Sequence, residues 1–120
     1  MNNIIHLDYH SRTPIYEQIV KQFERYVALG LLKPNEQILS IRELAAVLGI
    51  NPNTVKKAYE NLEQKKVIYA VSTKGYFISD NTNEIIQRKV NEKIDKIKDI
   101  IIELEKLGVS KEQVIDKLSK

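Results

Sequence analysis

The chain has 120 residues, of which 42% are hydrophobic and 29% are charged, and its formal net charge at pH 7 is +3. This length suits one compact domain with a short appendage, and this composition is typical of an ordered, water-soluble protein. No apolar run approaches the ~18 residues of a membrane helix, and the first ten residues lack the basic leader and apolar core of a secretory signal. We therefore expect a cytoplasmic protein without contact with a membrane.

The sequence shows no recognisable arrangement of metal-binding or catalytic residues. The absence of cysteine excludes disulfides and thiolate metal sites, which suits the cytosol. The two histidines, His6 and His10, stand apart from any carboxylate cluster. The sequence also contains no phosphate-binding glycine loop and no acidic pair in a recognisable catalytic setting. We expect no metal site, no cofactor and no enzymatic activity.

The excess positive charge lies in the middle of the chain. Ser40–Ser79 holds six Lys and Arg against three Asp and Glu, whereas the segments before and after it are balanced. Such an excess indicates an anionic partner, and the alternative is an ordinary solvated face that carries three extra lysines.

The first third of the chain predicts a short strand and a helix. Apolar residues at positions 4–7 suggest the strand. Thr13 as N-cap and Pro14 as first helical residue mark the start of the helix, and Gly30 suits its C-cap. Between them, apolar residues recur at helical spacing at Ile15, Ile19, Phe23, Tyr26 and Val27.

Two short helices separated by a glycine are predicted next. Ser40, followed three residues later by Glu43, forms a capping box that opens a helix ending at Gly49. Asn51 is a strong N-cap and Pro52 suits the first position of the second helix. Apolar residues then follow at i, i+3, i+4 and i+7, namely Val55, Ala58, Tyr59 and Leu62. The competing interpretation is a free-standing Asn-Pro-Asn turn.

The segment 67–78 predicts a β-hairpin. Its strands, 67–71 and 76–78, flank a turn that carries Lys74 and Gly75. A cation at the tip suits an anionic partner, and glycine permits a close approach of the backbone.

The last third predicts two helices. The first begins near Asn83 and ends at Gly108, and a capping box of Ser110 and Gln113 opens the second. Apolar residues in the first recur by four and three and form a seam, which consists of Val90, Ile94, Ile97, Ile101 and Leu104. Because the heptads are few, the seam either faces a partner helix in a dimer or folds onto its own domain.

This order of elements describes a mainly α fold with a small β-hairpin, in which a winged helix-turn-helix, residues 1–79, precedes a helical dimerisation tail, residues 80–120. In that fold the second helix enters the DNA major groove and its N-terminal residues reach the base edges. Amides and ammonium groups suit bases and phosphates, and the positive helix end attracts phosphate. The residues that we expect to contact double-stranded DNA are Arg42, Asn51, Asn53, Thr54, Lys56, Lys57 and Lys74.

The stretches "PIYEQI", "SIRELAAVLGINPNTVKKAYENLE" and "KGYFI" resemble the DNA-binding domain of the GntR family of bacterial transcription regulators over residues 13–79. The resemblance implies that Ser40 and Arg42 contact phosphate and base, that the recognition-helix contacts include Asn51, Asn53, Thr54 and Lys56, and that Lys74 and Gly75 belong to the wing. The sequence departs from the family pattern at a few loop positions. Asn35, Lys66 and Thr73 stand where the family usually has glycine, Lys65 replaces an acidic residue, and Leu39 replaces a proline.

About 40 residues follow the DNA-binding domain, too few for the large effector-binding domain that most of the family carries. A short helical tail resembles the YtrA-like branch, whose members dimerise through two C-terminal helices and often control transporter operons. Because two-fold symmetry in a protein predicts two-fold symmetry in its operator, we expect a homodimeric repressor that binds an inverted repeat. The alternative is a winged-helix module that binds protein without sequence-specific DNA binding. The sequence identifies no small-molecule effector.

Overall fold

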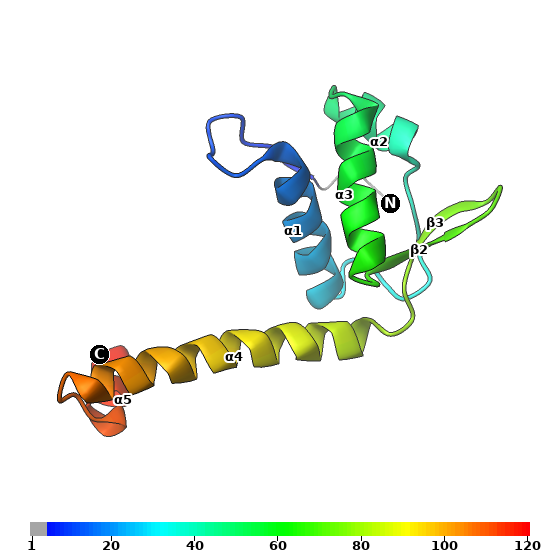
Figure 1. The fold of residues 1–120 in the computed structure, drawn as a ribbon. Coiled ribbons are helices and arrows are strands. Elements are labelled where there is room, and N and C mark those ends of the chain that lie inside the picture. The colour runs from blue at the N-terminus through cyan, green and yellow to red at the C-terminus, as the bar shows by residue number, and fades with distance from the viewer. Residues whose placement is uncertain (1–4) are drawn as a thin grey trace. The chain divides into compact units, whose positions relative to one another are not determined.

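The computed structural model describes residues 5–120 and has two compact units, one ending at Ile85 and the other spanning Ile86–Lys120. The helices and strands, in chain order (Figure 1), are α1 (Ile15–Ala28), β1 (Gln37–Ile38), α2 (Ile41–Leu48), α3 (Pro52–Gln64), β2 (Ile68–Val71), β3 (Gly75–Ile78), α4 (Thr82–Lys106) and α5 (Lys111–Leu118). This architecture confirms the predicted fold class, a winged helix-turn-helix followed by C-terminal helices.

Helix α3 is the centre of the first unit. It contacts α1, α2 and β2, and its predicted apolar face is fully buried: Val55, Ala58, Tyr59 and Leu62 each have 0% exposure. Ile19 and Phe23 of α1 and Leu44 of α2 complete this core, also at 0%. The opposite face of α3 therefore remains available to a partner.

The predicted caps of α2, α3 and α5 are confirmed, because the residues that make them are local in sequence. The Ser40 hydroxyl accepts a hydrogen bond from the Glu43 N–H, and the Glu43 carboxylate accepts one from the Ser40 N–H. Gly49 ends α2 in the left-handed region, with φ of 67°. Asn51 is the N-cap of α3, with Pro52 directly after it. A second capping box, Ser110 with Gln113, opens α5.

The sheet has three antiparallel strands in the order β1-β3-β2, and the hairpin of β2 and β3 extends away from α1, α2 and α3 (Figure 1). We call residues 68–78 the wing. The hairpin was predicted, whereas β1 was missed because two residues are too few for an alternating pattern. The buried side chains of Ile38, Ile68 and Ile78 lie on one face of the sheet, and Gln37 and Phe77 lie together on the other.

The predicted strand at positions 4–7 is wrong for residues 5–7, and residue 4 lies outside the described residues. Side chains of α1 replace a neighbouring strand. The Gln22 amide accepts from the His6 N–H at 2.8 Å and donates to the His6 carbonyl at 2.6 Å. Gln18 makes the same pair of bonds with Asp8, both at 2.9 Å. The backbone N–H and carbonyl groups of His6 and Asp8 are thus hydrogen-bonded without a β-ladder.

Helix α1 begins one residue later than predicted. Pro14 is its N-cap and makes no side-chain capping bond, so the predicted N-cap at Thr13 is wrong. Thr13 instead offers its carbonyl to the Gln18 amide at 2.9 Å. At the other end, Leu29 is the C-cap in place of the predicted Gly30, which follows it in the left-handed region with φ of 74°.

The second unit contains most of α4 and all of α5. Three seam residues, Val90, Ile94 and Ile97, are exposed, whereas Ile101 and Leu104 are half-buried. None of the helices within residues 5–120 is long and apolar enough to cross a membrane.

Candidate nucleic-acid interface

Two asparagines lie close together at the N-terminal end of α3 and have different roles there. The Asn51 Oδ1 atom accepts the Asn53 N–H at 2.8 Å, which fixes the start of the helix. The Asn53 side chain is exposed and makes no hydrogen bond with any described residue. Asn53 therefore offers both the donor and the acceptor of its side-chain amide to a partner. The side-chain oxygen of Asn51, in contrast, already accepts a hydrogen bond within the helix.

The two lysines after this end point to different neighbours. The Lys57 ammonium lies over the Tyr16 ring, 4.1 Å from its centroid. The Lys56 ammonium is 4.0 Å from the Glu60 carboxylate, and both side chains are about 60% exposed. An exposed pair of this kind is weak and can be exchanged for a phosphate contact. Thr54 lies between these groups and is half-buried.

The start of α2 presents Ser40 and Arg42. The Ser40 oxygen accepts the Glu43 N–H at 3.1 Å, so its own O–H remains able to donate to phosphate. Arg42 is exposed on the first turn. The hydrogen bond from the Ser40 backbone N–H holds the pKa of the Glu43 carboxyl below its ordinary value, so this group is a carboxylate at neutral pH. Glu43 therefore acts as a local cap and contributes negative charge beside Arg42.

Tyr59 joins the elements that carry these groups. Its hydroxyl donates to the Leu39 carbonyl at 2.6 Å, directly before the N-cap of α2. Its ring makes edge-on contacts with Phe23 of α1 at 5.8 Å and with Tyr76 of the wing at 4.9 Å. Burial raises the pKa of the Tyr59 phenol far above its usual range, so the hydroxyl remains a donor. Such a buried aromatic centre fixes the start of α2 and the wing against α3.

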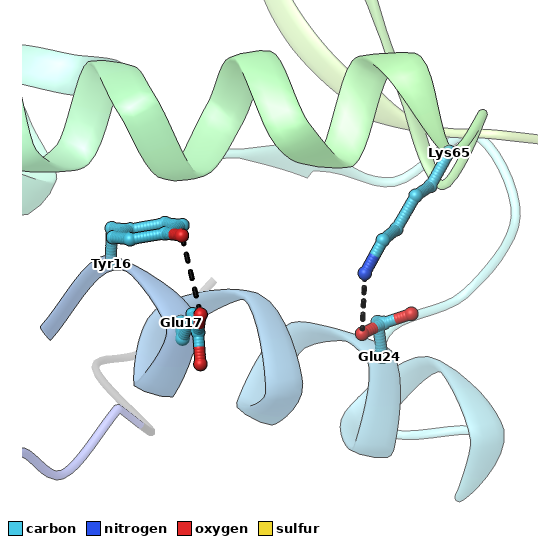
Figure 2. A network of polar contacts seen from close by, with 4 residues as sticks. All are labelled: Tyr16, Glu17, Glu24 and Lys65. Atoms are coloured by element: carbon cyan, nitrogen blue, oxygen red, sulfur yellow. Dashed lines mark hydrogen bonds and ion pairs between the residues drawn. The ribbon is translucent and has the colours of Figure 1, made fainter. Parts of the chain in front are cut away.

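A second contact fixes α3 against α1 at its other end. Lys65, the C-cap residue of α3, lies 3.7 Å from the carboxylate of Glu24 on α1 (Figure 2). The Glu24 side chain is 8% exposed, so this pair is better protected from solvent than a surface pair. Because Lys57 also contacts Tyr16 near the start of α3, α3 is attached to α1 near both of its ends.

The wing places Lys74 and Gly75 at its tip. Lys74 is exposed, and its backbone N–H donates to the Val71 carbonyl at 3.0 Å, which closes the turn. Gly75 has φ of 123°, and a Cβ built on it would lie 3.1 Å from the Gln37 amide nitrogen. The close approach that Gly75 permits within the described residues is therefore to Gln37, a residue that the sequence did not single out.

The three residues that stand where the family usually has glycine adopt a backbone conformation that is typical of glycine. Asn35, Lys66 and Thr73 have φ of 64°, 61° and 66°, all in the left-handed region. They are the described non-glycine residues with positive φ. Asn35 tolerates this region best, and its Oδ1 atom also accepts the Tyr69 hydroxyl at 2.9 Å. The loop geometry is thus retained at some cost in backbone strain.

The expected contacts divide by the element that carries them. The α3 group consists of Asn51, Asn53, Thr54, Lys56 and Lys57, the α2 group of Ser40 and Arg42, and the wing group of Lys74 and Gly75. The first unit holds all three groups, and Tyr59 joins their three elements. No cluster of three or more His, Cys, Asp or Glu suited to a metal ion is found among residues 5–120. The contacts of the α3, α2 and wing groups with DNA remain predictions.

Comparisons with known proteins identify the family. Residues 15–78 match the family model of bacterial regulatory proteins, gntR family. The HTH-type transcriptional repressor YtrA of Bacillus subtilis (strain 168) is 37% identical over 112 residues, which cover 92% of this chain and 86% of the repressor.

Two solved structures agree with this match. A transcriptional regulator from Oenococcus oeni is 36% identical, with a TM-score of 0.79 and 94% of both chains covered. YtrA from Sulfolobus acidocaldarius, a GntR-family transcription factor, is 40% identical, with a TM-score of 0.60, and the match covers 73% of this chain and 98% of that one. The chain therefore belongs to the gntR family of bacterial regulatory proteins, whose members regulate transcription through a helix-turn-helix domain.

Proposed function

We propose that this protein is a homodimeric, sequence-specific repressor that binds an inverted-repeat operator. The observation that carries the proposal is the N-terminal end of α3, where Asn53 presents an unengaged amide above a fully buried opposite face. An asparagine amide can form two hydrogen bonds with adenine in the major groove. The end of the helix also carries partial positive charge that favours a phosphate.

The other predicted contacts have complementary roles in this proposal. Lys56 and Lys57 supply charge beside the reading residue, and Arg42 and Ser40 reach the backbone or a base from α2. Lys74 enters the neighbouring minor groove from the wing. Phosphate contacts fix the register of a protein on the duplex, whereas base contacts provide the sequence preference. Asn53 is accordingly the expected reader, and the cations provide most of the salt-dependent affinity.

Dimerisation through the second unit would provide the second half-site. The exposed seam residues Val90, Ile94 and Ile97 are 44–50% accessible, and a partner helix would cover them. A two-fold dimer requires a two-fold operator, with recognition helices about 34 Å apart. Linking two small domains makes the second binding event effectively intramolecular, which compensates for the few base contacts of one domain.

The similarity to the B. subtilis repressor YtrA supports repression over activation. By resemblance to the YtrA-like branch of the family, the regulated genes include a transporter operon. The protein acts in the cytoplasm.

The test is selection of bound duplexes from a random pool at several salt concentrations. We expect a palindromic consensus whose binding constant falls steeply as salt rises. A consensus without two-fold symmetry would contradict the dimer on an inverted repeat. No enrichment at any salt concentration would contradict DNA reading and favour a protein-interaction module.

A further inference from the structure

The side chain of Gln37 connects β1 to the tip of the wing. Gln37 pairs with Phe77 in the sheet, yet its Nε2 atom donates at 2.8 Å to the backbone carbonyl of Lys74, three residues nearer the tip. Strand β1 ends at Ile38, so the glutamine amide extends the hydrogen bonding of the sheet beyond the end of its edge strand.

Gly75 leaves the room that this contact needs. The Gln37 nitrogen is the atom that a Cβ at Gly75 would meet, at 3.1 Å, which is tighter than an ordinary van der Waals contact. Gly75 also lies on the same face of the sheet as Gln37, since Gly75 and Phe77 are two residues apart on β3. The amide therefore crosses the face of the hairpin where a side chain is missing.

Asn35, which lies two residues before Gln37, makes a second contact with the same face of the wing. Tyr69 stacks on Phe77 with ring centroids 5.6 Å apart, and its hydroxyl donates to Asn35 at 2.9 Å. The segment Asn35–Gln37 thus holds the wing at its base and at its tip. A two-stranded hairpin is only marginally stable alone, so such ties decide how well its tip is ordered.

We propose that Gln37 is a positioning residue for DNA binding, which holds the Lys74 backbone so that the exposed ammonium group meets DNA at a fixed place. This inference rests on the proposed function. Ordering the tip in advance removes a conformational cost that binding would otherwise incur. Gln37 acts through Lys74 and itself needs no contact with DNA.

The test measures the dissociation constant for the duplex enriched in the random-pool selection. Gln37→Met keeps the length of the side chain and removes the N–H donor. The same exchange at Gln64→Met is the matched control, because Gln64 is exposed and makes no side-chain hydrogen bond with a described residue. Each variant is measured with Lys74 present and in a Lys74→Ala background. Hydrogen exchange of the Lys74 and Gly75 amides reports the order of the tip, and circular dichroism verifies folding.

We expect Gln37→Met to weaken binding by about three- to tenfold when Lys74 is present. In the Lys74→Ala background the same change should have less than about a twofold effect, because coupled residues are not additive. Exchange at the tip should become faster in Gln37→Met and stay unchanged in Gln64→Met.

Two results would overturn the inference alone, namely unchanged binding of Gln37→Met, or an equal loss in both backgrounds. Failure of the unmodified chain to enrich any sequence would overturn the proposed function, and this inference with it.

Discussion

The Nζ atom of Lys57, in the second turn of α3, lies 4.1 Å from the centroid of the Tyr16 ring on the first turn of α1. This cation–π contact attaches the N-terminal part of α3 to α1. It also distinguishes Lys57 from Lys56, whose ammonium is 4.0 Å from the exposed Glu60 carboxylate. The two adjacent lysines therefore have different consequences for stability, although both are expected to contact DNA.

Lys57→Met should lower the free energy of unfolding by about 0.5–1 kcal/mol, because the contact with Tyr16 is lost. Lys56→Met is the matched control and should change it by less than about 0.5 kcal/mol, since exposed ion pairs are weak. Urea denaturation measures both. Equal midpoints for the two variants would mean that the Tyr16 contact contributes nothing to the fold.

Asn51→Ala should destabilise the fold by about 1 kcal/mol, because the Asn53 N–H loses its capping acceptor. Asn51→Ser retains an acceptor and should lose much less. Thermal unfolding of both variants, compared with the unmodified chain, measures the difference. If serine is no better than alanine, the cap does not stabilise α3.

Lys66→Gly should raise the free energy of unfolding by about 0.5–1 kcal/mol. Lys66 has φ of 61°, which costs a residue with a Cβ about 1–2 kcal/mol, and the flexibility of glycine in the unfolded chain offsets part of the gain. Lys66→Ala is the control, because it removes the same charge but keeps the Cβ. A gain in the alanine variant equal to that in glycine would attribute the effect to charge instead of backbone strain.

Lowering the pH should destabilise the start of α2. The pKa of the Glu43 carboxyl in the folded protein lies below its ordinary value, because the carboxylate accepts the Ser40 N–H. A lowered folded pKa contributes stability above the unfolded pKa, and this stability is lost as the pH falls through the folded pKa. Glu43→Gln can still form the capping box, so its melting temperature should decline less between about pH 5 and pH 3. Parallel pH profiles would refute this role.

Ile97→Glu should weaken dimerisation and DNA binding together, because it places a charge in the proposed helix interface. Ile102→Glu is the matched control. Both isoleucines are 50% exposed, and five residues turn the helix by about 140°, away from the seam. Light scattering measures the dimer, and titration with the selected duplex measures DNA binding. A dimer of unchanged stability in Ile97→Glu would exclude the seam as the interface.

The features that the sequence predicts well are those determined by residues close together in the chain. Both capping boxes, the Asn51 cap and the buried face of α3 depend on neighbours within one or two turns of helix. The failures have non-local causes. Segment 5–7 looks like a strand, yet the His6 backbone pairs with the Gln22 side chain, and the adjoining Asp8 backbone pairs with the Gln18 side chain, both on helix α1.

Local sequence patterns likewise do not predict the contacts that hold the candidate site residues in place. Gln37 and Lys74 are 37 residues apart, and Tyr59 is 20 residues from the Leu39 carbonyl that it binds. Residue types and spacing lead to a prediction of which side chains contact DNA. They gave no signal for the residues that hold those side chains in place, because such contacts depend on how distant segments meet in the fold.

The proposed function rests on the claim that Asn53, at the start of α3, reads a base in duplex DNA. Parallel selections from one random pool, with the unmodified protein and with Asn53→Ala, test this role. We expect the variant to lose preference at one position in each half-site, a loss of about 1–3 kcal/mol of discrimination, while the rest of the consensus is kept. An identical consensus from both proteins would contradict the claim.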